Sequence, residues 1–397
     1  MRVLVLTSFY PPHHLGGYEV ACESAVRGLR ERGHEVRVLT SSFRNPGVSG
    51  GDDAVRELHL FWEAGEWRRP GLVGAVGATR QDLGVLERAV AEHRPDLVWC
   101  WQMSALSKSL LSRCAAIGVP IALAVHDLWP LYDLRPDPWL RWVRGWRAPV
   151  GWLLSGIARL PRDPPDLRRA AASYNSAWTR ERVVRAGITA EGPVIPPGVD
   201  LERFAPTPPA PGPVRRFLHV GRIEPRKGPT VAVEALAHLG DAGIADATLT
   251  LVGPSERGHA REVEAAARRL GLGGRVVVEG AIRREDMPAA YARHDAVIHS
   301  ATWEEPFGLT IVEAMACGRP VIVSPTGGAK EIVTESNALT FPPGDAEACA
   351  KRMWQLASDP ALASRLAEEG LRTAARYSER EVNGADEEHL RSVVERS

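Results

Sequence analysis

The chain has 397 residues, 44% of them hydrophobic, with 49 basic and 49 acidic side chains and five scattered cysteines. This length exceeds what one hydrophobic core usually supports, so two domains are expected. The zero net charge gives no overall attraction for nucleic acid, and cysteines without a Cys-x-x-Cys pair are not typical of a disulfide framework. They are expected to be small buried residues in a reducing cytosol.

The first elements have the pattern of a doubly wound α/β domain. Residues 3–6 form an apolar run typical of a strand buried on both faces, too short for a signal peptide. A loop with Gly16 and Gly17, a helix to about residue 32 and a strand at 36–40 follow. This is a βαβ unit with glycines in its first crossover. No stretch of the chain approaches the length of a membrane span.

The rest of the first domain continues this alternation. Residues 45–81 are rich in glycine and are expected to be irregular apart from a strand at 55–61, with a helix at 82–93. Strands are expected at 97–101 and 119–125, with a helix at 104–117 between them. Because the carboxyl ends of parallel strands face the ligand crevice, His126 is a candidate site residue. The alternative is a capping or structural histidine.

Residues 129–161 differ in composition, with five tryptophans among arginines. Asp137 as N-cap and Pro138 behind it predict a helix, which Pro149 should end or kink. At helical spacing Trp139, Trp142 and Trp146 share an apolar face opposite the arginines. Such a segment could lie in a membrane interface, cover an apolar acceptor, or pack its tryptophans on its own domain.

A segment rich in proline and glycine from about residue 196 indicates the linker, giving domains of residues 1–197 and 198–378. The second domain opens with a strand at 216–220, and Arg222 and Lys227 follow in one loop. Two cations there could stabilise a diphosphate leaving group. The alternative is a pair of solvated surface cations. A further strand is expected at 248–252, directly before Gly253. Another is expected at 276–279, before a turn that contains Ile282 and Arg283.

Residues 301–323 pass from a loop through a helix to an apolar strand. Phe307, Gly308 and Leu309 mark the helix start, where free backbone N–H groups bind anions. Glu305 precedes the helix and Glu313 lies in its first turns. Two carboxylates beside an anion site are suited to hydroxyls, one on a ribose and one on a sugar. The alternative is an ordinary amphipathic helix with an acidic first turn.

The string EPFGLTIVEAMACGRPV resembles the E-x7-E signature of the retaining glycosyltransferases of family 4. The spacing of Arg222 and Lys227, and the segment GVDLERF, resemble the same family. The resemblance implies the GT-B fold, an α/β architecture of two doubly wound Rossmann-like domains facing each other across a cleft. It implies an acceptor domain first and a donor domain second, with a last helix at 379–397 crossing back to the first.

The resemblance also implies roles for single residues. Gly16 and Gly17 bring their backbone against the donor diphosphate, and His126 lies beside the transferred sugar. Glu305 contacts the sugar and Glu313 the ribose. The catalytic set is His126, Arg222, Lys227 and Glu305. The residues expected to bind the donor are Gly16, Gly17, Arg222, Lys227, Gly253, Ile282, Arg283, Glu305, Phe307, Gly308, Leu309 and Glu313.

The expected reaction is transfer of a sugar from a UDP- or GDP-type sugar nucleotide to an acceptor hydroxyl, with retention. The acceptor is expected to be a lipid, a glycan or a hydrophobic natural product. There is no D-x-D motif, so no metal and no further cofactor are expected. The protein should be cytoplasmic, with membrane contact through Trp139, Trp142 and Trp146. The alternatives are a sugar-nucleotide 2-epimerase of the same fold, or an inactive binding protein.

Overall fold

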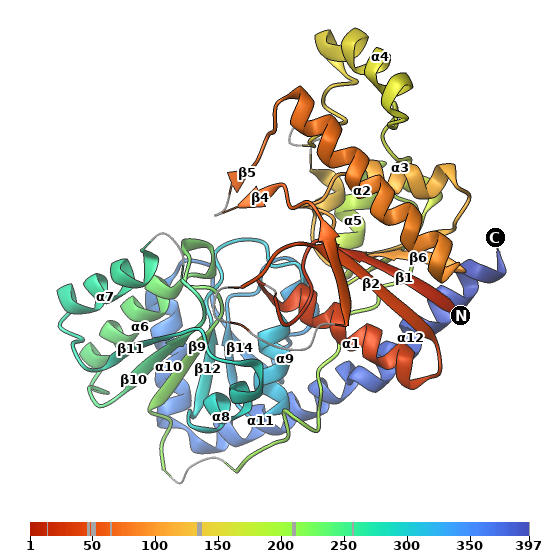
Figure 1. Ribbon diagram of the computed structural model, residues 1–397. Helices are drawn as coiled ribbons and strands as arrows, with labels where there is room; N and C mark the ends of the chain where they lie inside the picture. The colour runs from red at the N-terminus through yellow and green to blue at the C-terminus, as the bar shows by residue number, and fades with distance from the viewer. Residues whose placement is uncertain are drawn as a thin grey trace. The chain divides into compact units, whose positions relative to one another are not determined.

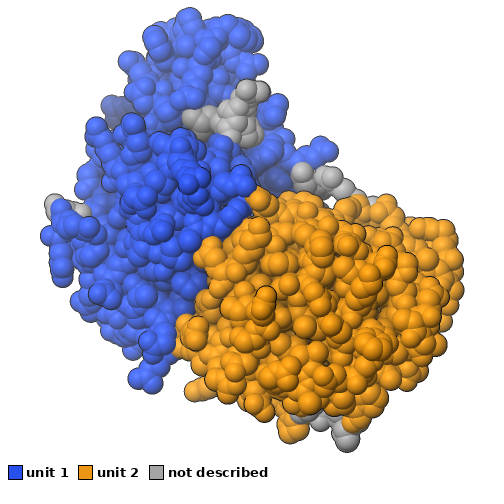
Figure 2. All heavy atoms as spheres, turned by 180° about the vertical axis from the view of Figure 1, so that it is seen from behind, with its two compact units in different colours: residues 1–196, 380–397 blue, residues 197–379 orange. Residues whose placement is uncertain are grey.

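A computed structural model of the protein describes residues 1–13, 15–45, 48, 53–63, 66–132, 137–208, 212–255 and 258–396. The chain divides into two compact units (Figure 2). Unit 1 consists of Met1–Pro196 and Arg380–Ser397, and unit 2 of Pro197–Glu379. Each unit is built around one parallel sheet of six strands (Figure 1).

The sheet of unit 1 has the strand order β3-β2-β1-β6-β7-β8 and is parallel throughout. A two-stranded antiparallel hairpin, β4 and β5, lies outside this sheet. The strands are β1 (Arg2–Thr7), β2 (Glu35–Ser41), β3 (Ala54–Leu58), β4 (Trp62–Glu63), β5 (Glu66–Trp67), β6 (Leu97–Cys100), β7 (Ile121–Val125) and β8 (Ala171–Tyr174).

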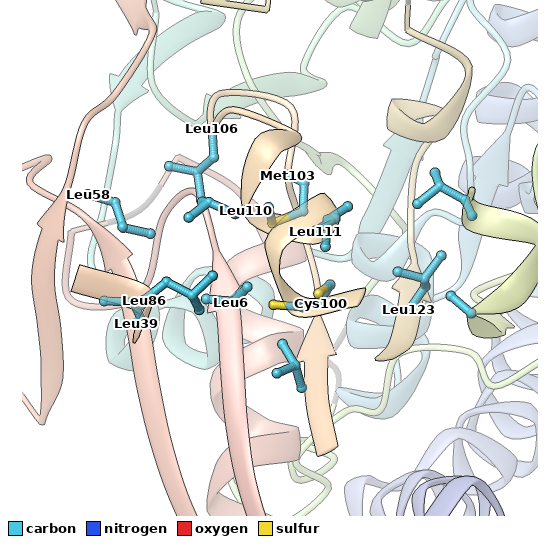
Figure 3. Packing of buried hydrophobic residues seen from close by; sticks show 14 of the residues in the cluster. Leu6, Leu39, Leu58, Leu86, Cys100, Met103, Leu106, Leu110, Leu111 and Leu123 are labelled. Carbon is cyan, nitrogen blue, oxygen red and sulfur yellow. The ribbon is translucent and has the colours of Figure 1, made fainter. Parts of the chain in front are cut away.

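Helices cover both faces of this sheet because its strands are apolar on both sides. Val3 and Val5 pack with α1 and α12, whereas Leu4 and Leu6 pack with α2, α3 and α5. Figure 3 shows Leu6 of β1 among Leu86 of α2 and Leu110 and Leu111 of α3. The helices are α1 (Gly17–Glu31), α2 (Leu72–His93), α3 (Ser109–Ala116), α4 (Ala148–Ala158), α5 (Ala177–Arg185) and α12 (Glu379–Glu395).

Unit 2 repeats the plan with the strand order β11-β10-β9-β12-β13-β14. Helices α6, α7 and α10 pack in one cluster of buried residues, α8 and α9 pack in another, and α11 contributes to both. The strands are β9 (Arg216–Val220), β10 (Thr248–Val252), β11 (Val276–Gly280), β12 (Ala296–His299), β13 (Val321–Val323) and β14 (Ala338–Thr340). The helices are α6 (Pro229–Asp241), α7 (His259–Arg269), α8 (Met287–Ala292), α9 (Leu309–Ala316), α10 (Ala346–Ser358) and α11 (Pro360–Ala374).

The predicted fold class, two doubly wound α/β domains, is confirmed. The prediction of irregular structure up to residue 81 is wrong, because α2 begins at Leu72. Ala75 and Leu83 of that helix are buried, so its packing outweighs the low helix propensity of Gly74 and Gly77. The strand expected at 55–61 is present as β3 (Ala54–Leu58), which ends three residues earlier. Other parts of the segment 45–65 lie outside the described residues.

The helix expected from Asp137 is also wrong. Residues 138–143 form turns, and α4 begins only at Ala148, with Pro149 in its first turn. The Asp137 carboxylate accepts N–H groups from Lys108, Trp139 and Leu140, so it fixes a turn against a neighbouring loop. Trp139 is fully buried, and its indole N–H donates to the Pro161 carbonyl oxygen at 2.7 Å. The expected helical face shared by Trp139, Trp142 and Trp146 therefore does not form. Trp139 packs on its own domain, as one of the alternatives held, whereas Trp146 is 84% exposed.

Among the helices of the described residues, none is long and apolar enough to cross a membrane.

Candidate active site

Lys227 and Glu305 meet where two neighbouring strands of unit 2 end. Lys227 closes a short 3-10 turn (Pro225–Lys227) after β9, and Glu305 follows β12, which pairs with β9. The Lys227 ammonium donates a hydrogen bond to Glu305 Oε2. The Trp303 indole N–H donates to the same oxygen at 3.2 Å. The carboxylate is thus held as an ion between two donors.

Backbone contacts position both members of this pair. Gly228, at φ 65°, lies so close to β12 that a Cβ there would be 1.9 Å from the Ser300 carbonyl oxygen. A Cβ on Gly327 would be 2.3 Å from the Glu305 carbonyl oxygen, which accepts the Gly328 N–H at 2.8 Å. Glycines therefore let two loops approach closely, and this approach fixes the direction of both side chains.

The protonation states follow from burial and charge. Burial opposes ionisation of Glu305, but the Lys227 ammonium and the hydrogen bonds from Lys227 and Trp303 hold the pKa of Glu305 below its ordinary value. His299, the last residue of β12, is buried, and burial lowers its pKa to about 4. At neutral pH the site therefore combines an ionised carboxylate, a lysine ammonium and a neutral histidine.

Glu313 lies on α9 with only 1% of its surface exposed. It forms an ion pair with Arg284 and accepts the Tyr291 hydroxyl at 3.0 Å. Both partners come from the segment after β11, so this carboxylate joins α9 to the neighbouring turn and α8. Arg284 was not predicted from the sequence. Arg283, which was predicted to bind the donor, is exposed and pairs with Glu285 and Asp286 in its own turn.

The start of α9 has the backbone geometry of an anion site. Gly308 precedes the helix at φ 107°, a conformation that favours glycine. Phe307 is buried in the same cluster as Ile311. Leu309 is the first helical residue, so its N–H group lies in the turn without intrahelical acceptors. The partial positive charge of this turn favours an anion.

Arg222 and Gly253 follow adjacent strands β9 and β10. Arg222 Nη2 lies 3.1 Å from Glu224 Oε1, and 42% of its side chain is exposed. Gly253, at φ 149°, would place a Cβ 1.9 Å from the Gly221 carbonyl oxygen, so only glycine fits. Ile282 is half-buried beside the α8–α9 cluster. Unit 2 thus gathers its predicted residues at the carboxyl edge of one sheet, except for Arg283, which pairs within its own turn.

Unit 1 brings Gly16, Gly17 and His126 close to one another through Tyr18. Gly16 precedes α1, and its N–H donates to Glu19 Oε2 at 2.8 Å. The Tyr18 ring stacks on the His126 ring with centroids 5.1 Å apart, and the Tyr18 hydroxyl accepts the backbone N–H of His126 at 3.1 Å. Burial lowers the pKa of His126 to about 3, so this imidazole is neutral.

Two carboxyl groups in the same part of unit 1 were not predicted from the sequence. Burial raises the pKa of Glu19 to about 7 and that of Asp127 to about 6. Glu19 stands three residues after Gly16, a spacing typical of a carboxylate that accepts an N–H at a helix start. The Gly16–Glu19 spacing is therefore the sequence feature from which Glu19 could have been predicted.

In the part of the chain that the structure describes, no group of three or more His, Cys, Asp or Glu side chains could hold a metal ion.

Comparison with known proteins identifies the family. A model described as glycosyltransferase family 4 matches residues 15–203, and one described as glycosyl transferases group 1 matches residues 202–373. The D-inositol 3-phosphate glycosyltransferase of Xylanimonas cellulosilytica is 34% identical, over 91% of this chain and 88% of that protein. The chain belongs to glycosyltransferase family 4. The predicted family is therefore confirmed.

Other relatives agree with this family 4 assignment. A GDP-mannose-dependent alpha-(1-6)-phosphatidylinositol monomannoside mannosyltransferase of Mycobacterium tuberculosis is 28% identical over 84% of this chain and 82% of that protein. The structure of Anabaena HepE in complex with UDP and glucose has a TM-score of 0.72 at 22% identity, covering 99% of this chain and 100% of that one. This likeness confirms the GT-B fold of the family 4 chain.

Proposed function

We propose that this glycosyltransferase moves a sugar from a nucleoside-diphosphate sugar to an acceptor hydroxyl with retention at the anomeric carbon. The observation that carries the proposal is the Lys227–Glu305 pair on neighbouring strand ends of unit 2. Arg222 lies in the same loop as Lys227, so two cations are available for one diphosphate. The start of α9 adds the partial charge of a helix N-terminus.

In the proposed reaction the bond between the anomeric carbon and the diphosphate oxygen breaks, and the acceptor oxygen bonds to that carbon on the same face. The departing phosphate takes the proton of the acceptor hydroxyl. Lys227 and Arg222 stabilise the charge that develops on the diphosphate. These cations and the helix terminus take the place of a metal ion, so the proposed reaction needs none.

Glu305 and Glu313 have different surroundings, which supports different roles. Glu305 Oε2 accepts from Lys227, which is proposed to contact the phosphate as well. The other carboxylate oxygen of Glu305 is therefore suited to a hydroxyl of the neighbouring sugar. Glu313 is held by Arg284 and Tyr291, which is suited to a fixed contact with a ribose hydroxyl. His126, neutral and partly exposed, is suited to exchange a hydrogen bond with a substrate hydroxyl.

The names of relatives support a UDP or GDP donor. The mycobacterial relative is called GDP-mannose-dependent, and the Anabaena structure contains UDP and glucose. The names of the curated relatives refer to inositol phosphate or phosphatidylinositol mannoside, which supports an acceptor that carries phosphate or lipid.

Thermal shift with UDP, GDP and their common sugars tests the donor proposal. A ligand at 100 times its Kd stabilises the folded protein by about 2.7 kcal/mol, so the correct base should raise the unfolding temperature measurably. Glu313→Gln should reduce this shift, whereas Glu279→Gln, in an exposed pair with Arg293, should not. No shift with any nucleoside diphosphate would contradict the proposal. An epimer of the donor formed without acceptor would indicate the 2-epimerase instead.

A further inference from the structure

Helix α4 (Ala148–Ala158) exposes four of its five large apolar side chains, and the fifth, Leu154, packs partly on the core of unit 1. The buried residues of α4 are Gly151 and Ser155, one helical turn apart. The exposed fractions are 54% for Trp152, 67% for Leu153 and 74% for Ile157. A surface helix of a globular protein normally has the opposite arrangement, with its apolar stripe facing the core. Figure 1 shows α4 standing apart from the sheet of unit 1.

Close contacts fix this orientation of α4. A Cβ on Gly151 would lie 2.1 Å from the Trp142 carbonyl oxygen, so any larger residue on this face would clash with the backbone. The Ser155 hydroxyl accepts Nε–H of Arg162 at 2.8 Å. The helix ends at Arg159, at φ 54°, and the next N–H donates back to the Ser155 carbonyl oxygen at 3.0 Å. Rotating the helix to bury Leu153 or Ile157 would break these contacts.

Exposed apolar residues are concentrated at this helix. Among the described residues, twelve large hydrophobic side chains are exposed, and five of them fall within residues 146–157. Single exposed apolar residues are normal on a soluble protein, but a contiguous group marks an interaction surface. The five are Trp146, Val150, Trp152, Leu153 and Ile157.

The segment around α4 carries charge of one sign. Residues 138–162 contain five arginines and no aspartate or glutamate. Arg144 and Arg159, on either side of the helix, are exposed. The Arg147 guanidinium lies 4.8 Å from the centroid of the exposed Trp146 ring. An apolar helix with tryptophan and a rim of arginines complements the interface of an anionic bilayer, where aromatic rings lie at headgroup depth and cations bind phosphate.

We propose that α4 and its flanking arginines dock this protein on an anionic phospholipid membrane. Trp152, Leu153 and Ile157 enter the boundary between headgroups and acyl chains, and Arg144 and Arg159 bind lipid phosphates. A second copy of the chain fits this surface poorly, because a two-fold contact would bring two sets of arginines together without acidic partners in the segment. The docking is independent of the proposed sugar chemistry.

Vesicle cosedimentation of the full chain tests this proposal. The probes are vesicles of phosphatidylcholine and vesicles of an equal mixture of phosphatidylcholine and phosphatidylglycerol. Wild type should bind the mixed vesicles and bind phosphatidylcholine alone much less. The triple variant Trp152→Ser, Leu153→Ser, Ile157→Ser should lose binding by about tenfold or more, because it removes the apolar anchor. These side chains are exposed, so the unfolding temperature should stay unchanged.

The double variant Arg144→Gln, Arg159→Gln tests the proposed contribution of arginine charge to membrane binding. It should weaken binding to the mixed vesicles by about fivefold for each arginine. Matched controls lie in unit 2, where Val277→Ser with Trp354→Ser removes exposed apolar surface and Arg268→Gln with Arg365→Gln removes exposed charge. Both controls should bind as wild type does. Equal binding by the triple variant and wild type, or no vesicle binding by wild type, would overturn the proposal. So would a wild-type dimer that the triple variant converts to monomer.

Discussion

The Lys227 ammonium donates to the Glu305 carboxylate across two neighbouring strand ends of unit 2. A buried pair of this kind does not by itself contribute much to stability, since desolvation offsets the attraction. The proposed role of the pair is to hold a cation and an anion at fixed positions where a charged substrate binds. The pair can therefore be tested through turnover and through stability separately.

Replacing Lys227 or Arg222 with alanine should lower kcat by about 100- to 1,000-fold, because each removes one preorganised donor from the leaving diphosphate. Steady-state release of nucleoside diphosphate measures this. Arg226→Ala is the control. Arg226 lies in the same loop as Arg222 and Lys227, but it pairs with Glu224 and lies over the Trp303 ring. Near-normal kcat in either the Lys227 or the Arg222 variant would show that the diphosphate assignment is wrong.

Glu313→Ala and Glu305→Ala should separate binding from transfer. The first removes the proposed ribose contact and leaves the half-buried Arg284 without its carboxylate partner, so it should weaken nucleoside diphosphate binding and lower stability by about 3 kcal/mol. The second should reduce sugar transfer more than binding of the free nucleoside diphosphate. Calorimetric Kd values for both variants check this division. An equal loss of affinity in both would refute it.

Acid should destabilise unit 2 partly through His299. Burial lowers its folded pKa to about 4 from an ordinary value near 6.5, so the folded state resists protonation. The cost is absent above pH 6.5 and grows as the pH falls toward 4, reaching about 3 kcal/mol. The unfolding temperature of His299→Gln should therefore fall less than that of wild type between pH 7 and pH 4.

The control for this comparison is His238→Gln, because His238 is exposed on α6. It should follow the wild-type curve. If His299→Gln and wild type lose the same number of degrees over this range, His299 is not the buried titrating group.

Activity should survive an excess of EDTA. In the proposed reaction, Arg222, Lys227 and the start of α9 supply the positive charge that a metal ion would otherwise provide. Donor turnover before and after chelation, followed by addition of Mg²⁺ or Mn²⁺, measures this dependence. Activity that is lost on chelation and restored by either ion would refute metal independence.

The sequence predicted most strands of unit 2 well, because continuous apolar runs bounded by glycine have few alternatives, but it did not predict the edge strand β14 (Ala338–Thr340). The strand at residues 248–252 agrees with β10 (Thr248–Val252) to the residue. The prediction of Lys227 and Glu305 rests instead on the resemblance to the E-x7-E signature and to the family spacing of Arg222 and Lys227, together with the positive charge that a diphosphate requires. The structure places both residues after neighbouring strands of one sheet, which is where polar residues that follow parallel strands gather.

The rest depended on contacts between distant parts of the chain. Asp137 has the sequence features of a helix N-cap, but its carboxylate also accepts the Lys108 N–H, and that loop determines the turn. The sequence indicated the turn that contains Arg283 as part of the donor site, but it gave no signal that the adjacent Arg284 pairs with Glu313 on a distant helix. The exposed face of α4 was missed because its orientation depends on the fit of Gly151 against the Trp142 backbone.

The most direct test of the central claim is a proton NMR time course with the donor identified by thermal shift. Even without an acceptor, water can take the sugar slowly, and the anomer released first reports the stereochemistry. A retaining transfer assisted by Lys227 should give the donor's own anomeric configuration in the first product, released together with nucleoside diphosphate, and Lys227→Ala should release almost none of either. An inverted first product, or undiminished release by Lys227→Ala, would contradict the proposed reaction.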